Sequence, residues 1–371
     1  MKSISTALAC LALLVAPILG APTAPLIEVQ KSAGKAKQGS YIVKLKDHVV
    51  KTNHLSWLSQ HLGASSAVTH AEWDTDLLHG FAGTFSTAAL NALRASPDVD
   101  YIEEDGVMSI NSVITDTTLT AGSGVDIFVV DTGIYTAHSQ FGGRARWGAT
   151  FGGYADADGN GHGTHVSGTA AGSQFGVAKG ANLIAVKVLS DSGSGAVSDI
   201  VSGLNWVATQ ARSSGRPSIA TMSLGGGAST SLDNAVASLT SGGVHVTVAA
   251  GNSNVDAGTT SPARAPSANT IGATTIADAR ASFSNFGSVV DLWAPGQNVI
   301  SAWIGSTTAT NNISGTSMAT PHVAGLIAYL IGRDGNSSPA AMSTTLKNTS
   351  VKNAISGIPS GTINDLARND E

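Results

Sequence analysis

Apolar and polar positions divide the chain into a leader, a small N-terminal module and a long C-terminal part. In the leader, an apolar run over residues 7–19 follows Lys2 and ends at small residues. This pattern is typical of a cleaved signal peptide, here over residues 1–20, and the run is too short to span a bilayer. A short buried helix is the alternative interpretation. We expect a secreted, extracellular protein with no membrane partner.

Residues 38–111 alternate between strand-like and helix-like patterns. Strand-like alternation occurs over 41–46, 80–85 and 99–104, and helical spacing of apolar positions occurs over 49–62 and 87–93. The order approximates βαββαβ, which predicts a small ferredoxin-like α+β module beginning near residue 38. An independent adaptor domain is the alternative.

The C-terminal part has the pattern of an α/β domain. A near-continuous apolar run over 124–130 is typical of a strand buried in a parallel sheet, and it ends at Asp131. We therefore expect a mostly parallel central sheet flanked by helices. Asp131 then lies at the carboxyl edge of the sheet, where open α/β sheets place their sites. A metal ligand or a turn cap is the alternative role for Asp131.

Composition excludes several classes of protein. Hydrophobic residues make up 42% of the chain and charged residues only 12%, which is a composition of folded rather than disordered proteins. A formal net charge of −5 indicates no nucleic-acid partner. The single cysteine, Cys10, lies in the leader, so a mature chain without it has no disulfide, no thiolate metal site and no cysteine nucleophile.

A glycine-rich motif over 159–171 contains two histidines. His162 stands at the expected start of a helix, where its ring can reach a cleft, whereas His165 is expected to point into packing. Two histidines three residues apart could also ligate zinc, but the sequence has no HExxH motif and no third ligand fixed by spacing. A metal-dependent hydrolase is therefore a distant alternative.

A second motif, over 312–325, places Ser317 near a helix start. The dipole and the free N–H groups of a helix N-terminus favour developing negative charge. Pro321 is compatible with the first turn of that helix. The pattern G-T-S-M-A lacks the second glycine of the G-x-S-x-G elbow, which argues against an α/β-hydrolase. An ordinary helix cap is the alternative role for Ser317.

The three residues occur in the order Asp, His, Ser, which is the order of subtilisin. The motifs DTGI, GHGTHVSGT and SGTSMATPHVAG resemble the signatures of the subtilase family, and 222–227 and 282–287 resemble its proteinase K branch. Residues 41–45, 80–83 and 99–103 resemble the inhibitory propeptide of that family. The resemblance implies a subtilisin-like peptidase domain over 112–371, preceded by a propeptide over 21–111 that is removed by self-cleavage.

The resemblance also implies roles for individual residues. Ser317 would be the nucleophile, His162 its general base, Asp131 the residue that orients the base, and Asn252 an oxyanion-hole donor. The expected activity is a monomeric serine endopeptidase of broad specificity with an apolar preference. Protein and peptide substrates and its own propeptide are the expected partners. The residues expected to bind substrate backbone are Gly193, Ser194, Gly195, Ser223, Leu224 and Gly225.

The resemblance implies a structural Ca²⁺ site, although the chemistry itself requires no cofactor. Asp291 would supply a carboxylate, and Pro266 and Ala268 would supply backbone carbonyls. A local hydrogen bond is the alternative role for Asp291.

One segment departs from the family pattern. Only residues 110–130 join the propeptide-like module to the strand before Asp131, and the Trp-Gly-Leu segment usual in relatives is missing there. A catalytically incompetent subtilase-like protein is therefore the alternative function. The mature N-terminus is expected near 111–114.

Overall fold

The N-terminal module and the C-terminal domain share one strand. The computed structural model describes residues 26–32, 36–62, 67–75, 78–110 and 121–369. The predicted signal peptide and the predicted mature N-terminus lie outside these ranges.

The N-terminal module has the predicted βαββαβ order. Its elements are β2 (Ala36–Leu45), α1 (Lys51–Leu62), β3 (Ala67–Asp74), β4 (His79–Phe85), α2 (Thr87–Ala95) and β5 (Val99–Ile110), with a short β1 (Val29–Gln30) paired to β5. The strands are antiparallel in the order β5-β2-β4-β3. Sequence reasoning did not locate β3 and ended the last strand six residues too early.

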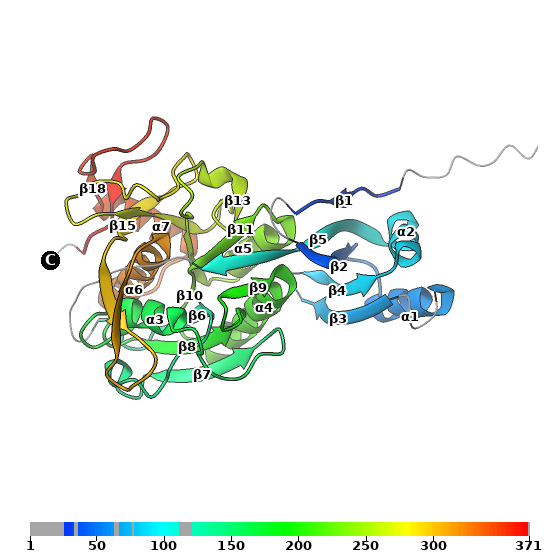
Figure 1. Cartoon of the computed structure of the whole chain (residues 1–371), viewed down its shortest axis with the longest axis horizontal. Helices are drawn as coiled ribbons and strands as arrows, with labels where there is room; N and C mark the ends of the chain where they lie inside the picture. The colour runs from blue at the N-terminus through cyan, green and yellow to red at the C-terminus, as the bar shows by residue number, and fades with distance from the viewer. Residues whose placement is uncertain (1–25, 33–35, 63–66, 76–77, 111–120, 370–371) are drawn as a thin grey trace, which may run out of the picture.

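Alternation along β2 gives the module two buried faces. Val43 packs with Phe81 and Leu93 in the module's own core, beneath α1 and α2. Ile42 points to the opposite face and joins the core of the C-terminal domain, where it clusters with Leu204. The module is therefore docked through the outer face of its sheet (Figure 1).

The C-terminal domain is built on a nine-stranded sheet. Its order is β18-β19-β15-β14-β12-β10-β6-β8-β7, and every pair is parallel except β18 with β19. The strands are β6 (Asp126–Asp131), β7 (Ala145–Thr150), β8 (Asn182–Lys187), β10 (Ser218–Met222), β12 (His245–Ala249), β14 (Asn269–Thr274), β15 (Leu292–Pro295), β18 (Val351–Lys352) and β19 (Asp365–Leu366). The predicted mostly parallel sheet is confirmed.

Helices cover both faces of this sheet. The helices are α3 (His162–Ala171), α4 (Val197–Ser214), α5 (Thr230–Ser241), α6 (Thr316–Asp334) and α7 (Pro339–Thr349). Val129 of β6 packs with α3 and α6, whereas its neighbour Val130 packs with α4 and α5. Because successive residues of a strand point to opposite faces, a continuous apolar run is what a sheet covered on both sides requires.

Smaller elements complete the chain. They are β9 (Ser194–Ala196), β11 (Leu224–Gly227), β13 (Thr260–Ser261), β16 (Val299–Ala302), β17 (Thr310–Ile313) and the 3₁₀ turns η1 (Ser139–Phe141) and η2 (Ala257–Thr259). Strand β5 of the module is antiparallel to both β9 and β11, so its end runs into the C-terminal domain (Figure 1). Among the described residues, no helix is both long and apolar enough to cross a membrane.

Two buried carboxylates of β5 dock the module on helix N-termini. Glu103 accepts a hydrogen bond from the Ser231 N–H of α5 at 2.8 Å, and Asp105 accepts one from the Ser198 N–H of α4 at 3.0 Å. Free N–H groups and the helix dipole favour negative charge there. Burial raises the pKa of Glu103. Burial alone would raise the pKa of Asp105 too, but hydrogen bonds, the largest from His70, leave it below its ordinary value.

Candidate active site

Neighbouring parallel strands end at one edge of the nine-stranded sheet and present polar residues there. Asp131 is the last residue of β6, and Ser223 directly follows β10. Asn252 follows β12 by three residues. Since β6, β10 and β12 are adjacent in the sheet, their carboxyl ends bring these three residues to the same edge.

Asp131 and His162 form a close, buried pair. His162 Nδ1 lies 2.7 Å from Asp131 Oδ1 and 2.9 Å from Oδ2. The Asp131 side chain is fully buried and that of His162 is 2% exposed. A carboxylate on Nδ1 favours the tautomer that carries the proton on that nitrogen, in which Nε2 can act as a base.

The start of α3 is fixed by close backbone approach. Gly161 precedes His162 with φ of 100°, which favours glycine, and a Cβ on Gly163 would lie 2.1 Å from the Gly133 oxygen. Asp158 accepts hydrogen bonds from the N–H groups of Gly161 and Thr164 at 2.8 and 3.0 Å. The glycines of the motif therefore let α3 begin against the loop after β6, which sets His162 beside Asp131.

Ser317 is the second residue of α6, and α6 packs against α3. Its Oγ donates to the Ser223 carbonyl at 3.0 Å, and the Ser223 hydroxyl donates to the Ser317 carbonyl at 2.5 Å. Pro321 explains the second bond: it lacks the N–H that would bond the Ser317 carbonyl within the helix. The expectation that Pro321 lies in the first turn was wrong, because α6 begins at Thr316 and Pro321 lies in its second turn.

Asn252 is held against the start of α6. Its Oδ1 accepts hydrogen bonds from the Thr316 N–H at 2.8 Å and the Thr316 hydroxyl at 2.9 Å. The amide is thus oriented through its oxygen beside Ser317, and its NH₂ group is the donor end. Asn252 also lines a pocket of about 380 Å³ whose described lining residues are all uncharged: Leu224, Gly225, Gly226, Gly227, Ala249, Gly251, Asn252, Ser253, Thr259, Thr260 and Asn285.

The predicted substrate-binding segments lie on either side of β5. Ser194 and Gly195 of β9 pair with Ser109 and Met108, while β11 pairs through Leu224 with Ile110 and through Gly225 with Ser109. Gly193 and Ser223 directly precede these strands. Strand β5 thus lies between the edges of β9 and β11 and pairs with both, as an extended peptide does in β-augmentation.

Comparisons with known proteins agree with this geometry. The model of the subtilase family matches residues 122–365, and the model of peptidase inhibitor I9 matches residues 40–111. The chain belongs to the subtilase family. It is accordingly a serine endopeptidase that carries an I9 inhibitor propeptide, which implies peptide substrates and inhibition by the propeptide.

Relatives of this subtilase share most of its length. It is 44% identical to the alkaline serine protease ver112 of Corniculantispora psalliotae, over 96% of both chains. It is 42% identical to a cuticle-degrading protease of Metarhizium anisopliae, over 98% of this chain and 99% of the relative. The crystal structure of a cold adapted subtilisin-like serine proteinase superposes with a TM-score of 0.64 and 47% identity, covering 68% of this chain and 92% of that one.

His165 packs inside the subtilase domain. Its Nε2 lies 3.3 Å from the Val299 carbonyl and 3.2 Å from the Asn311 carbonyl. Burial lowers the pKa of His165 to about 3, and repulsion from His162 adds to the effect. Because its ring faces β16 and β17, it does not share a ligand site with His162. Among the described residues, no group of three or more His, Cys, Asp or Glu is placed to hold a metal ion.

The predicted calcium ligands line one cavity, together with a lysine. Asp291, Pro266 and Ala268 border a space of about 660 Å³. Lys347 Nζ lies 2.6 Å from Asp291 Oδ1, and Asp291 Oδ2 accepts a hydrogen bond from the Thr270 N–H at 2.9 Å. Both carboxylate oxygens are engaged, so the residues do not fit Ca²⁺ while Lys347 holds this position.

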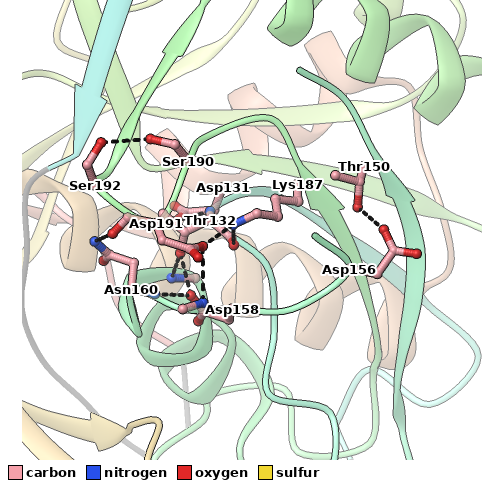
Figure 2. A network of polar contacts seen from close by, with 12 residues as sticks. Asp131, Thr132, Thr150, Asp156, Asp158, Asn160, Lys187, Ser190, Asp191 and Ser192 are labelled. Atoms are coloured by element: carbon pink, nitrogen blue, oxygen red, sulfur yellow. Dashed lines mark hydrogen bonds and ion pairs between the residues drawn. The ribbon is translucent and has the colours of Figure 1, made fainter. Parts of the chain in front are cut away.

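Sequence reasoning missed the polar groups that support the pair of Asp131 and His162. Thr132 donates its hydroxyl to Asp158 at 2.9 Å, and Lys187 Nζ donates to the Thr132 carbonyl at 2.6 Å (Figure 2). One signal was available for Lys187, since a lysine ends the apolar run of β8.

Acid stability offers a test of the buried, neutral state of His165. Its folded pKa of about 3 lies below the ordinary value of 6.5, so in this window the unfolded chain binds a proton that the folded chain does not. Stability is therefore lost as pH falls, by roughly 2 kcal/mol between pH 6.5 and 4.5 from this group. We expect His165→Asn to reduce this loss, measured by urea unfolding at both pH values in a Ser317→Ala background that prevents autolysis.

The exposed His48 provides the control, because His48→Asn should leave the pH dependence unchanged. An equal loss of stability in the wild type and in His165→Asn would contradict a neutral, buried His165.

Proposed function

We propose that this subtilase cleaves peptide bonds with Asp131, His162 and Ser317 through an acyl-enzyme. The observation that carries the proposal is the 2.7 Å contact of His162 Nδ1 with the buried Asp131 carboxylate. Packing of α3 on α6 supports it, because the helices bear His162 and Ser317 at their N-termini.

In the proposed mechanism, Ser317 Oγ attacks the substrate carbonyl while His162 Nε2 takes its proton. The resulting oxyanion accepts hydrogen bonds from the Asn252 amide and the Ser317 N–H, at a helix N-terminus that favours negative charge. His162 then gives the proton to the leaving amine. A water molecule, deprotonated by the same imidazole, attacks the acyl carbon, the bond to Ser317 Oγ breaks, and the imidazolium returns the proton to Oγ. Asp131 stabilises the imidazolium in both steps.

The proposed specificity is broad with an apolar preference. The uncharged lining of the pocket beside Asn252 gives a charged side chain no counter-charge. The backbone of residues 193–195 and 223–225 would bind the substrate through main-chain hydrogen bonds. Such binding selects an extended peptide rather than particular side chains.

The proposed life cycle begins with secretion of a monomeric zymogen. A signal peptide over 1–20 and an inhibitory propeptide over 21–111 would leave a peptidase domain over 112–371. Strand β5 supports inhibition, because it pairs with both segments that are proposed to hold a substrate.

Self-processing tests the nucleophile and the cleavage site together. Ile110, the last described residue of the propeptide, pairs with Leu224, which adjoins Ser223, whose carbonyl accepts from Ser317 Oγ. We expect cleavage after Asn111, giving a mature protein that begins at Ser112. N-terminal sequencing of the secreted protein checks this, and Ser317→Ala should yield only the form that retains the propeptide.

A catalytically incompetent protein is the alternative, because the segment joining the propeptide to the strand before Asp131 is short. It would appear as a wild-type protein that keeps its propeptide and does not hydrolyse casein. A Ser317→Ala protein that still processes itself would contradict the proposed nucleophile.

Removing the proposed oxyanion donor should slow catalysis without preventing binding. We expect Asn252→Ala to lower kcat by about 10²–10³ with little change in KM, which is the size of effect known for the corresponding kind of donor in subtilisin. Steady-state kinetics on a peptide substrate measure this. Ser253→Ala is the control, since Ser253 lines the same pocket. A kcat for Asn252→Ala within threefold of the wild type would rule out this role.

We also propose that Lys347 and Ca²⁺ compete for Asp291. Removing the ammonium group frees one carboxylate oxygen beside Pro266 and Ala268. We therefore expect added Ca²⁺ to raise the Tm of Lys347→Ala by roughly 4 °C, and to raise that of the wild type less. Thermal melts with Ca²⁺ and with a chelator measure the difference.

Lys352→Ala is the matched control, because Lys352 pairs with a different carboxylate, Asp365. Equal responses of the wild type and Lys347→Ala to Ca²⁺ would contradict the competition.

A further inference from the structure

A buried ammonium group lies next to the loop that carries the proposed catalytic carboxylate. Lys187 ends β8 and is the parallel partner of Asp131 at the end of β6. Its side chain is fully buried, and its Nζ donates to the Thr132 carbonyl at 2.6 Å and to Asp191 Oδ1 at 2.7 Å. The ring of Tyr154 lies 5.6 Å from Nζ. A buried cation is stable only when its hydrogen bonds are satisfied, so these acceptors fix its position.

On one side, Lys187 holds the residue that orients the catalytic carboxylate. The Thr132 N–H donates to Asp131 Oδ1 at 2.7 Å, and the Thr132 hydroxyl accepts from the Gly163 N–H at 3.0 Å. Thr132 therefore contacts both Asp131 and the first turn of α3, which carries His162. Because Lys187 donates to the Thr132 carbonyl, it restrains the residue that links Asp131 to the start of α3 (Figure 2).

On the other side, Lys187 holds Asp191, which contacts the approach to α3. Asp191 Oδ1 also accepts from the Gly159 N–H at 3.2 Å, and its carbonyl accepts from Asn160 Nδ2 at 2.9 Å. Asn160 Oδ1 in turn accepts from the His162 N–H at 3.2 Å. Figure 2 shows Asp191 and Asn160 facing each other across this junction.

Asp191 also belongs to the turn that leads into a substrate-binding strand. The Ser190 N–H donates to the Ser194 carbonyl at 2.9 Å, closing a turn around Asp191, and Ser194 is the first residue of β9. The hydrogen bond from Lys187 lowers the pKa of Asp191, so this carboxylate is ionised at neutral pH. The ion pair therefore spans from the Asp131 loop to the segment that pairs with β5.

We infer that Lys187 and Asp191 are positioning residues, which keep Asp131 and His162 in register with the substrate bound along β9. The inference rests on the proposed triad and goes beyond it, since neither residue touches the reacting atoms. Its consequence is that breaking the pair slows the chemical step even in correctly folded enzyme.

Asp191 offers a way to break the pair from the surface. Its side chain is 58% exposed, so Asp191→Asn keeps the shape of the turn and leaves the core untouched. We expect kcat per active site to fall about tenfold, with KM changed less than threefold, because small misplacements of catalytic groups cost rate rather than affinity. Active sites are counted by titration with a fluorophosphonate, which removes any effect of unfolded protein.

Asp156→Asn is the matched control. Asp156 is an exposed carboxylate in the same region, and it accepts a hydrogen bond from the Thr150 hydroxyl at 2.5 Å without contacting Lys187. Its kcat should equal that of the wild type. Asp191→Glu, which keeps the charge, should recover more than half of the loss in kcat.

Two results would overturn the inference. One is a kcat of Asp191→Asn within twofold of the wild type, even if its Tm falls, because the pair would then serve stability alone. The other is an equal fall in Asp156→Asn. Failure of the triad itself is distinguishable, since it would abolish fluorophosphonate labelling of Ser317 in the wild type and in every variant.

Discussion

The hydrogen bond between Asp131 and His162 is the contact on which the rest of the site depends. Each partner is fixed by a different part of the fold: Asp131 by the end of a strand buried on both faces, and His162 by a helix that begins at a glycine. The approach of α3 to the loop after β6 requires glycine at 163, where a Cβ would lie 2.1 Å from the Gly133 oxygen, and the φ of 100° at 161 favours glycine there. A Cβ at 163 would push α3 away from the loop that carries Asp131, whereas a Cβ at 161 would meet the Trp303 ring.

The propeptide lies along the path that we propose for a substrate. Strands β9 and β11 present backbone groups to β5, so the propeptide occupies the path proposed for a substrate without needing special side chains. Further contacts with the peptidase domain are made by Glu103 and Asp105 on helix N-termini and by Ile42 in its core. Docking of the propeptide and pairing along the cleft thus rely on different residues.

The sequence was sufficient to predict the parallel sheet, the ferredoxin-like module and the positions of Asp131, His162 and Ser317. These features are encoded locally, in apolar runs and in glycine-rich motifs around single residues. The pairing of β5 with β9 and β11 was not predictable in this way, because it joins segments more than 80 residues apart. For the same reason Lys347, 56 residues from Asp291, could not be foreseen as the partner of the expected calcium ligand.

The supporting groups were missed for a related reason. Thr132 lies in the DTGI motif but carries no reacting group, and Lys187 and Asp191 lie in no recognisable motif. Their importance comes from the junction in which Lys187 bonds both Thr132 and Asp191, which the sequence does not show. Pro321 illustrates a smaller limit. A proline is compatible with the first turn of a helix, but α6 begins at Thr316, so Pro321 lies in its second turn. Only the structure shows that the Ser317 carbonyl, which Pro321 cannot bond, accepts a hydrogen bond from the Ser223 hydroxyl instead.

The most direct measurement is to locate the residue that a fluorophosphonate modifies in the secreted wild-type protein. Peptide mapping by mass spectrometry should find one label, on Ser317, and casein hydrolysis should fall in proportion to labelling. A label on another residue, or hydrolysis that persists when Ser317 is fully labelled, would contradict a nucleophilic Ser317 activated by His162 and Asp131.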